Sequence, residues 1–195
     1  HGATPSVITD NAPTWVQGHD DNNNITTTTY THYLNGTITG TTQLTKQGDG
    51  TLVLEANNHT YSGTTDIWGG TLKFDRHSTL ITDGGSFDAG ITVDYGAKLN
   101  IGGVANKASA NVSNLTLNYG ARIVADIFSD GMDADLLNVT KLTINRKVGD
   151  NWTNYGPKYL APVLQIVQNN TQGAAKPADG KYLIAKIGNI SGSID

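Results

Sequence analysis

The amino-acid sequence predicts an all-β protein, a parallel β-helix (solenoid) with capped ends. The first observation is a repeat in which a short strand with alternating apolar residues follows a glycine turn. Thr51–Leu54 follows Gly48-Asp49-Gly50, and Thr71–Phe74 follows Gly69-Gly70 at an offset of 20 residues. This spacing is too long for a hairpin. It suits one coil of a solenoid, which buries its inward side chains against the next coil.

A second internal copy supports the same fold class. Ile91–Leu99 (ITVDYGAKL) and Leu115–Ile123 (LTLNYGARI) are offset by 24 residues, with four positions identical and five matched by type. Coils of 20 to 24 residues suit a three-sided β-helix, whose stacked strands lie about 4.8 Å apart. Alternation along each strand then predicts a set of inward-facing apolar residues. They are Leu52, Leu54, Leu72, Phe74, Val93, Leu99, Ile101, Leu115, Leu117 and Ile123.

The composition limits the alternatives. Only 37% of the 195 residues are hydrophobic, so the apolar residues are confined to short runs, and there are 23 glycines. Sixteen aspartates stand against a single glutamate, Glu55, which favours turns over helices. The net charge of −4, without a basic run, argues against a nucleic-acid partner. The sequence has no cysteine and no apolar run of membrane-spanning length, so neither a disulfide scaffold nor membrane insertion is expected.

The chain is expected to form one module, residues 1–195. Residues 1–35 read as an N-terminal cap, residues 36–145 as repeat coils, and residues 146–195 as larger final coils and a C-terminal cap. The chain starts with His1 and shows no signal peptide, so we expect a module excised from a longer exported protein. The strand candidates are short runs separated by Gly, Asn or Asp. They are Thr37–Thr39, Thr42–Lys46, Thr51–Leu54, Thr64–Ile67, Thr71–Phe74, Thr79–Thr82, Ile91–Val93, Lys98–Ile101, Leu115–Asn118, Arg122–Asp126, Leu136–Val139 and Lys141–Asn145.

Three aromatic-glycine dipeptides are candidates for a binding site. Trp68-Gly69, Tyr95-Gly96 and Tyr119-Gly120 recur at what we expect to be matching corners of successive coils. If the coils stack in register, the rings form a strip on the outside of the helix. Sugar rings dock on flat aromatic faces, while amides and carboxylates bind their hydroxyls, and the polar residues beside these aromatics are Asp66, Asp94 and Asn118. The pattern therefore predicts a polysaccharide site, or alternatively a packing ladder that stiffens the turns.

Other clusters give less specific signals. Trp152, Tyr155 and Tyr159, with amides between them, suit either a sugar platform or a seal at the end of the core, and Trp15 suits a cap or a site. Asp130–Asp135 offers spaced carboxylates, which calcium prefers, but no complete calcium loop follows. Calcium is therefore the one cofactor considered, and no catalytic constellation is recognised.

One motif resembles a known family. The matching residues are Leu44, Lys46, Gly48, Gly50–Leu52, Leu54, Asn58, Tyr61-Ser62-Gly63, Thr65, Ile67 and Gly70–Leu72. They resemble the passenger-associated transport repeat, also called the autotransporter-associated β-strand repeat. The resemblance implies a right-handed parallel β-helix on an exported bacterial protein, secreted or at the cell surface. More generally, the architecture and size are similar to β-helical carbohydrate-binding modules found beside bacterial xylanases.

Three functions follow as hypotheses. The first is a non-catalytic carbohydrate-binding module for a plant polysaccharide, with xylan favoured, attached to a catalytic domain in a larger secreted protein. The second is a structural or adhesive stalk of an autotransporter-like surface protein. The third is a polysaccharide lyase or hydrolase. Lytic β-helices usually need clustered Asp with Arg or Lys on one face, and Arg76, Arg122 and Arg146 do not line up with acids in such a pattern.

Overall fold

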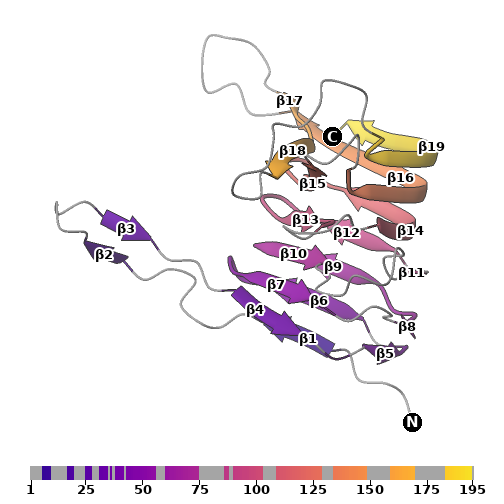
Figure 1. The fold of residues 1–195 in the computed structure, drawn as a ribbon. Coiled ribbons are helices and arrows are strands. Elements are labelled where there is room, and N and C mark those ends of the chain that lie inside the picture. The colour runs from indigo at the N-terminus through magenta and orange to yellow at the C-terminus, as the bar shows by residue number, and fades with distance from the viewer. Residues whose placement is uncertain are drawn as a thin grey trace, which may run out of the picture.

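In the computed structural model, parallel β-strands stack along one axis over most of the part of the chain that is described (Figure 1). The described residues are 6–9, 17–19, 25–27, 31–34, 36, 38–41, 43–55, 60–74, 86–87, 90–102, 109–128, 134–148, 159–169 and 183–194. No helix occurs among them. The predicted all-β class and the parallel stacking of coils are confirmed by this architecture.

Two sheets form the main sides of the stack. The longer one contains, in parallel, β1 (Ser6–Thr9), β6 (Leu44–Gln47), β9 (Thr65–Ile67), β12 (Ile91–Val93), β14 (Ser109–Leu117), β16 (Leu136–Val148) and β19 (Ala185–Ile194). The second sheet contains β4 (Thr31–Leu34), β7 (Thr51–Leu54), β10 (Thr71–Phe74), β13 (Lys98–Asn100), β15 (Arg122–Phe128) and β18 (Val163–Asn169), all parallel. Each coil therefore contributes one strand to each sheet before the next coil begins.

Shorter strands extend the coils beyond these two sheets. β5 (Thr39–Gly40) pairs in parallel with β8 (Thr60–Tyr61). β11 (Ser86–Phe87) pairs with the first half of β14, whereas β12 pairs with its second half, so β14 passes along two sides of its coil. The antiparallel pairs are β2 (Gln17–His19) with β3 (Ile25–Thr27), and β17 (Tyr159–Leu160) with the end of β16.

The later strands are longer than the sequence predicts. The separate candidates Leu136–Val139 and Lys141–Asn145 form the single thirteen-residue strand β16. No glycine or proline stands at Thr140, so nothing forces the backbone out of the extended conformation there. β14 likewise starts at Ser109, before the expected Leu115. Candidate Thr79–Thr82 lies outside the described residues.

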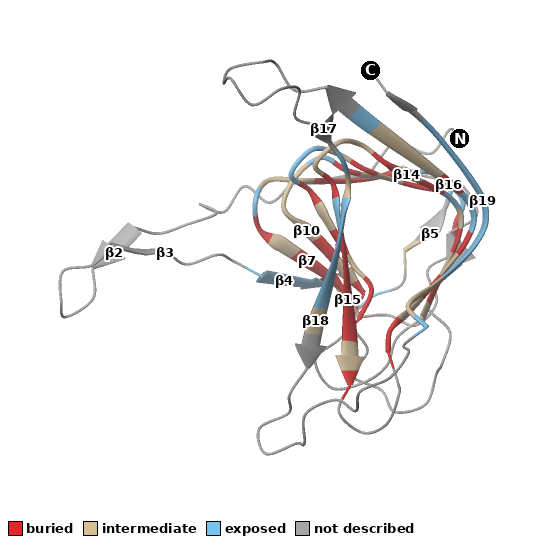
Figure 2. Ribbon diagram, turned by 90° about the horizontal axis from the view of Figure 1, so that it is seen from above, coloured by how far each residue is buried: buried red, intermediate tan, exposed pale blue. Residues whose placement is uncertain are grey.

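The interior consists of columns of apolar side chains in register. Leu52, Leu72, Leu99 and Ile123 align across β7, β10, β13 and β15. All ten residues predicted to face inward are buried and belong to one core cluster. Figure 2, which views the stack from above, shows the two sheets on either side of a common interior, with buried stretches along both. Period-two alternation thus correctly predicted the core face of these strands.

One lysine lies in this interior. Lys46 aligns with Ile67 in the register of β6 and β9, and its side chain is fully buried. Its Nζ donates hydrogen bonds to the backbone oxygens of Gln47 at 2.6 Å, Gly48 at 2.9 Å and Gly69 at 3.3 Å. The buried ammonium therefore ties the glycine turn of one coil to that of the next, because buried charge needs such partners.

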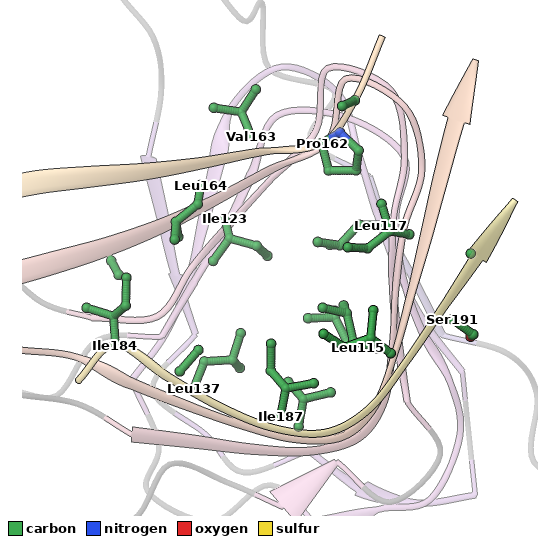
Figure 3. Close-up of a pocket in the computed structure, with 18 of the residues that line it drawn as sticks. Leu115, Leu117, Ile123, Leu137, Pro162, Val163, Leu164, Ile184, Ile187 and Ser191 are labelled. Carbon is green, nitrogen blue, oxygen red and sulfur yellow. The ribbon is translucent and has the colours of Figure 1, made fainter. Parts of the chain in front are cut away.

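The C-terminal end of the stack exposes core-type side chains. Ile190 aligns with buried Leu142, and Leu164 aligns with buried Ile123, yet they are 66% and 53% exposed. Side chains of β15, β16, β18 and β19 surround a cavity of about 620 Å³ there (Figure 3). The same alternation that fills the core between coils therefore leaves an apolar surface at this end.

Candidate functional site

The tyrosine corners are four-residue turns that join the two sheets. Asp94-Tyr95-Gly96-Ala97 links β12 to β13, and Asn118-Tyr119-Gly120-Ala121 links β14 to β15. In each, the last residue donates a backbone hydrogen bond of 3.0 Å to the oxygen of the first. Gly96 and Gly120 have φ of 74° and 72°, the third-position geometry that a type II turn reserves for glycine. The turn chemistry therefore fixes where each tyrosine leaves the backbone.

These turns bring the two tyrosine rings together. The centroids of Tyr95 and Tyr119 are 5.3 Å apart, with ring planes 37° apart. A β-carbon added to Gly120 would lie 2.6 Å from Cδ2 of Tyr95. The Tyr95 ring therefore covers the backbone of the next coil, while the residue stays 63% exposed. The two rings therefore pack against each other as the ladder alternative expects, while the polysaccharide site stays a prediction.

Trp68 is exposed as expected, at 54%, but it does not occupy the tyrosine position. The register aligns Ile67 with Val93 and Thr71 with Lys98. The corner Trp68-Gly69-Gly70 is therefore one residue shorter than the tyrosine corners. The backbone amide of Trp68 bonds the oxygen of Lys46, just as the first residues of the longer corners bond the preceding coil. Trp68 thus corresponds in position to Asp94. The expectation that all three aromatics occupy matching corner positions is therefore wrong for Trp68, and only Tyr95 and Tyr119 match.

The polar residues expected beside the rings are hydrogen-bonded to other side chains. The amide of Asn118 donates to the carboxylate of Asp94 at 2.5 Å, and the amide of Asn145 donates to Asn118 Oδ1 at 2.9 Å. These three residues form a polar ladder across successive coils. Asp66 lies within β9 and accepts a hydrogen bond from the Gln43 amide. The ladder therefore links the two tyrosine corners to each other and to β16.

The sequence reading missed two cations that follow the tyrosines. Lys98 and Arg122 each stand three residues after a tyrosine and are direct partners in the register of β13 and β15. Their neighbours Leu99 and Ile123 point into the core, so the cationic side chains point outward. The internal copy carries a signal for this pair, because its basic position matches by type, but only the strand register makes the two cations neighbours.

A groove of about 370 Å³ lies on the outer face of the second sheet, next to these cations. Its polar lining includes Lys73, Lys98, Asn100 and Gln165, with Tyr33 toward the first strand of that sheet. Tyr33 is 59% exposed. The groove crosses the strands, so it runs along the axis of the stack.

The acidic segment has a structural role where it is described. Asp135 is fully buried, and its carboxylate accepts a 2.9 Å hydrogen bond from the backbone amide of Asp126. That carboxylate also fills the space beside the α-carbon of Gly102. No group of three or more His, Asp or Glu side chains comes together in the described ranges. Asp130 and Asp133 lie outside those ranges.

The second aromatic cluster cannot be placed in the same way. Trp152, Tyr155 and Trp15 lie outside the described residues. Tyr159 begins β17, which pairs in antiparallel fashion with the end of β16. The roles expected for this cluster and for Trp15 therefore remain predictions from the sequence.

Comparison with known proteins identifies the repeat. Residues 44–74 match the family model of the passenger-associated-transport-repeat. In the fold, this segment runs from β6 through β10 and includes the Lys46 contact and the Trp68 corner. No curated protein and no solved structure gives a significant match to the chain. Among the described residues, no helix is long and apolar enough to cross a membrane.

Proposed function

We propose that the chain is a structural stalk segment of an exported bacterial surface protein of the autotransporter-passenger type. The observation that carries this proposal is the repeat at residues 44–74, which occupies successive coils of an in-register parallel stack. Passenger proteins carrying this repeat are surface-exposed or secreted, so the same localisation is proposed for this chain.

The geometry suits a rigid spacer. Each coil contacts its neighbours through the same apolar columns, so stability accumulates along the axis as in other solenoids. The exposed apolar end, with Leu164 and Ile190 in line with core positions, has the composition of the contacts between coils inside the stack. Another β-coil packed there would be stabilised by the same burial of apolar surface.

Surface display tests the stalk proposal. The chain is placed between a signal peptide and an outer-membrane β-barrel domain in a Gram-negative host, and surface exposure is measured with antibody and added protease. We expect surface exposure and protease resistance. Leu72→Asp should abolish both because it puts a charge in the core, whereas Lys141→Gln, at an exposed position, should change neither. A folded wild-type chain that stays in the periplasm would contradict the proposal.

A second candidate function is non-catalytic binding of a polysaccharide, with xylan the first ligand to test and a catalytic domain as the expected neighbour in the parent protein. The exposed Tyr95 ring, braced by Gly120 and stacked on Tyr119, supports it. A rigid aromatic surface costs little conformational entropy when a ligand binds. Hydrolytic or lytic activity is not expected, and assays for reducing ends and unsaturated products test that expectation.

Affinity electrophoresis against xylans, β-glucans and pectins tests glycan binding. Tyr95→Ala should reduce retardation if the tyrosine pair forms the platform, and Trp68→Ala reports on the neighbouring corner. Because Trp68 is exposed, its replacement should change the free energy of unfolding by less than about 1 kcal/mol. Absence of retardation by every glycan would remove this candidate while leaving the stalk proposal intact.

A further inference from the structure

The corner that carries the tyrosine pair also carries a cationic pair. Tyr95 and Lys98 belong to one coil, and Tyr119 and Arg122 belong to the next. Each pair lies in the same four-residue sequence, Tyr-Gly-Ala followed by a cation. Lys98 and Arg122 are cross-strand partners on adjacent strands, and strands in a sheet lie about 4.8 Å apart. The fold therefore places two like charges side by side, next to a stacked aromatic pair.

The fold itself does not account for this charge pair. Like charges at directly opposed positions of a sheet are destabilising. The chain contains 17 acidic residues against 13 basic ones, yet no ion pair from a described acid to Lys98 or Arg122 occurs. Thr71 occupies the same row one coil earlier, so a neutral residue is compatible with this position. A charged ligand would explain why two coils carry cations here.

We propose that the composite corner formed by Tyr95, Tyr119, Lys98 and Arg122 binds an acidic glycan, a polysaccharide whose sugars carry carboxylates. This inference rests on the second candidate function, glycan binding, and names its substrate class. The tyrosine faces take the apolar faces of sugar rings. The ammonium and guanidinium groups bind carboxylates, with the guanidinium able to do so in bidentate fashion.

The groove beside the cations sets the direction in which a bound glycan would run. Lys98 and Asn100 line it, with Gln165 on one side and Tyr33 on the other. The amides can bind sugar hydroxyls through both a donor and an acceptor. A glycan bound at the corner would therefore follow the groove across the strands, along the axis of the stack.

The charge balance favours a glycan over a nucleic acid. Nucleic-acid affinity depends on many phosphate contacts and on a basic surface, whereas this chain has a net charge of −4 and the composite corner contributes only Lys98 and Arg122. A glycan with spaced carboxylates and many hydroxyls matches the mixture of cations, amides and aromatic rings. Duplex DNA therefore serves as the competing polyanion in the test.

The test uses the full chain and compares polygalacturonate, unsubstituted xylan and duplex DNA by affinity electrophoresis and calorimetry. We expect polygalacturonate to bind with an affinity that falls with added salt. Lys98→Gln/Arg122→Gln should weaken that binding by at least roughly tenfold, the effect of losing strong charge-assisted contacts. The matched control is Lys141→Gln/Lys186→Gln, which removes two exposed cations from strands β16 and β19 and should leave binding unchanged.

Each other outcome overturns the inference in a recognisable way. Xylan bound as tightly as polygalacturonate, and unaffected by Lys98→Gln/Arg122→Gln, would keep glycan binding but exclude the acidic class. Equal binding of DNA, or equal loss in the Lys141/Lys186 control, would show general polyanion attraction. No binding of any glycan would remove both this inference and the glycan-binding candidate. Thermal unfolding of each variant verifies that the fold is retained.

Discussion

The ring of Tyr95 lies directly over the backbone of Gly120 on the next coil, so close that a β-carbon at Gly120 would come within 2.6 Å of Cδ2 of the ring. Gly120 thus meets two requirements at once. Its φ of 72° belongs to the left-handed region, and its missing side chain admits the neighbouring ring. Gly96 has the same φ sign but nothing within 4 Å of its added β-carbon. The two glycines therefore form a matched pair for experiment.

We expect Gly96→Ala to lower the free energy of unfolding by about 1 kcal/mol, the strain of a side chain in the left-handed region. Gly120→Ala should cost about 0.5–1.5 kcal/mol more, because the Tyr95 ring must leave its contact with Tyr119. Urea unfolding measures both. In a Tyr95→Ala background the two glycine substitutions should become equal, and a persisting difference would show that the ring contact is not its cause.

The buried lysine of the repeat gives a second prediction. Lys46→Met keeps the aliphatic stem but leaves the backbone oxygens of Gln47, Gly48 and Gly69 without their ammonium partner. These acceptors are partly buried, and leaving a buried acceptor without a partner costs about 1–3 kcal/mol, so a clear loss of stability is expected by chemical denaturation. Lys141→Met, at an exposed position, should change stability by less than about 0.5 kcal/mol. Equal effects would mean that the Lys46 contacts do not stabilise the turn.

The buried apolar residues could be predicted from the sequence, whereas the burial of Lys46 could not. Alternation of apolar residues correctly placed Leu52 and Leu72 inside, because burial follows the period of a strand. The same rule gives no reason to bury a lysine, whose burial depends on carbonyl groups from two different turns. Glycine spacing predicted the coils for a similar reason, since turns are local, whereas the contact between Gly69 and Lys46 is not.

The aromatic corner illustrates a second limit. Tyr95 and Tyr119 were predicted to match because their nine-residue surroundings repeat, and they do stack. Trp68 was grouped with them through its following glycine, but its corner is one residue shorter and moves it to the position of Asp94. Corner length is visible only once the register of both flanking strands is known. The cationic partners of the tyrosines were equally visible in the sequence, but only the register makes them neighbours.

The buried Tyr61 should make the folded state less stable at alkaline pH. Burial raises the pKa of Tyr61 well above its ordinary value, and its 2.6 Å hydrogen bond to the Thr65 hydroxyl lowers that pKa only in part. The unfolded chain loses this proton near pH 10, while the folded chain retains it. The unfolded state then binds fewer protons, so stability is fully present below about pH 10 and falls above it.

Tyr61→Phe should therefore behave differently at two pH values. At pH 7 it loses the hydrogen bond to Thr65 and should be less stable than the wild type by about 1 kcal/mol. At pH 11 the wild type should lose about 1.4 kcal/mol for each pH unit above 10 through this group, so the difference should shrink or reverse. Urea unfolding of both proteins at both pH values measures this. A difference that is independent of pH would show that Tyr61 ionises equally easily in both states.

The exposed end provides a prediction from two residues in the same column. Leu142 and Ile190 are register partners, but Leu142 is 7% exposed and Ile190 is 66% exposed. Leu142→Ser should lower the free energy of unfolding by several kcal/mol, about 2–5, because it combines a cavity with a buried hydroxyl. Ile190→Ser should cost less than about 0.5 kcal/mol, as is usual at exposed positions.

Replacing the exposed apolar side chains at this end of the stack should also change how the surface of the protein behaves. Exposed apolar patches bind the dye ANS and promote association, so the wild type should bind ANS and associate as its concentration rises. Leu164→Ser/Ile190→Ser should reduce both effects, because these side chains come from the two sheets at the rim of the cavity. ANS fluorescence and light scattering measure the change. A destabilised double variant, or unchanged dye binding, would mean that these side chains are packed in solution and that the end of the stack is covered.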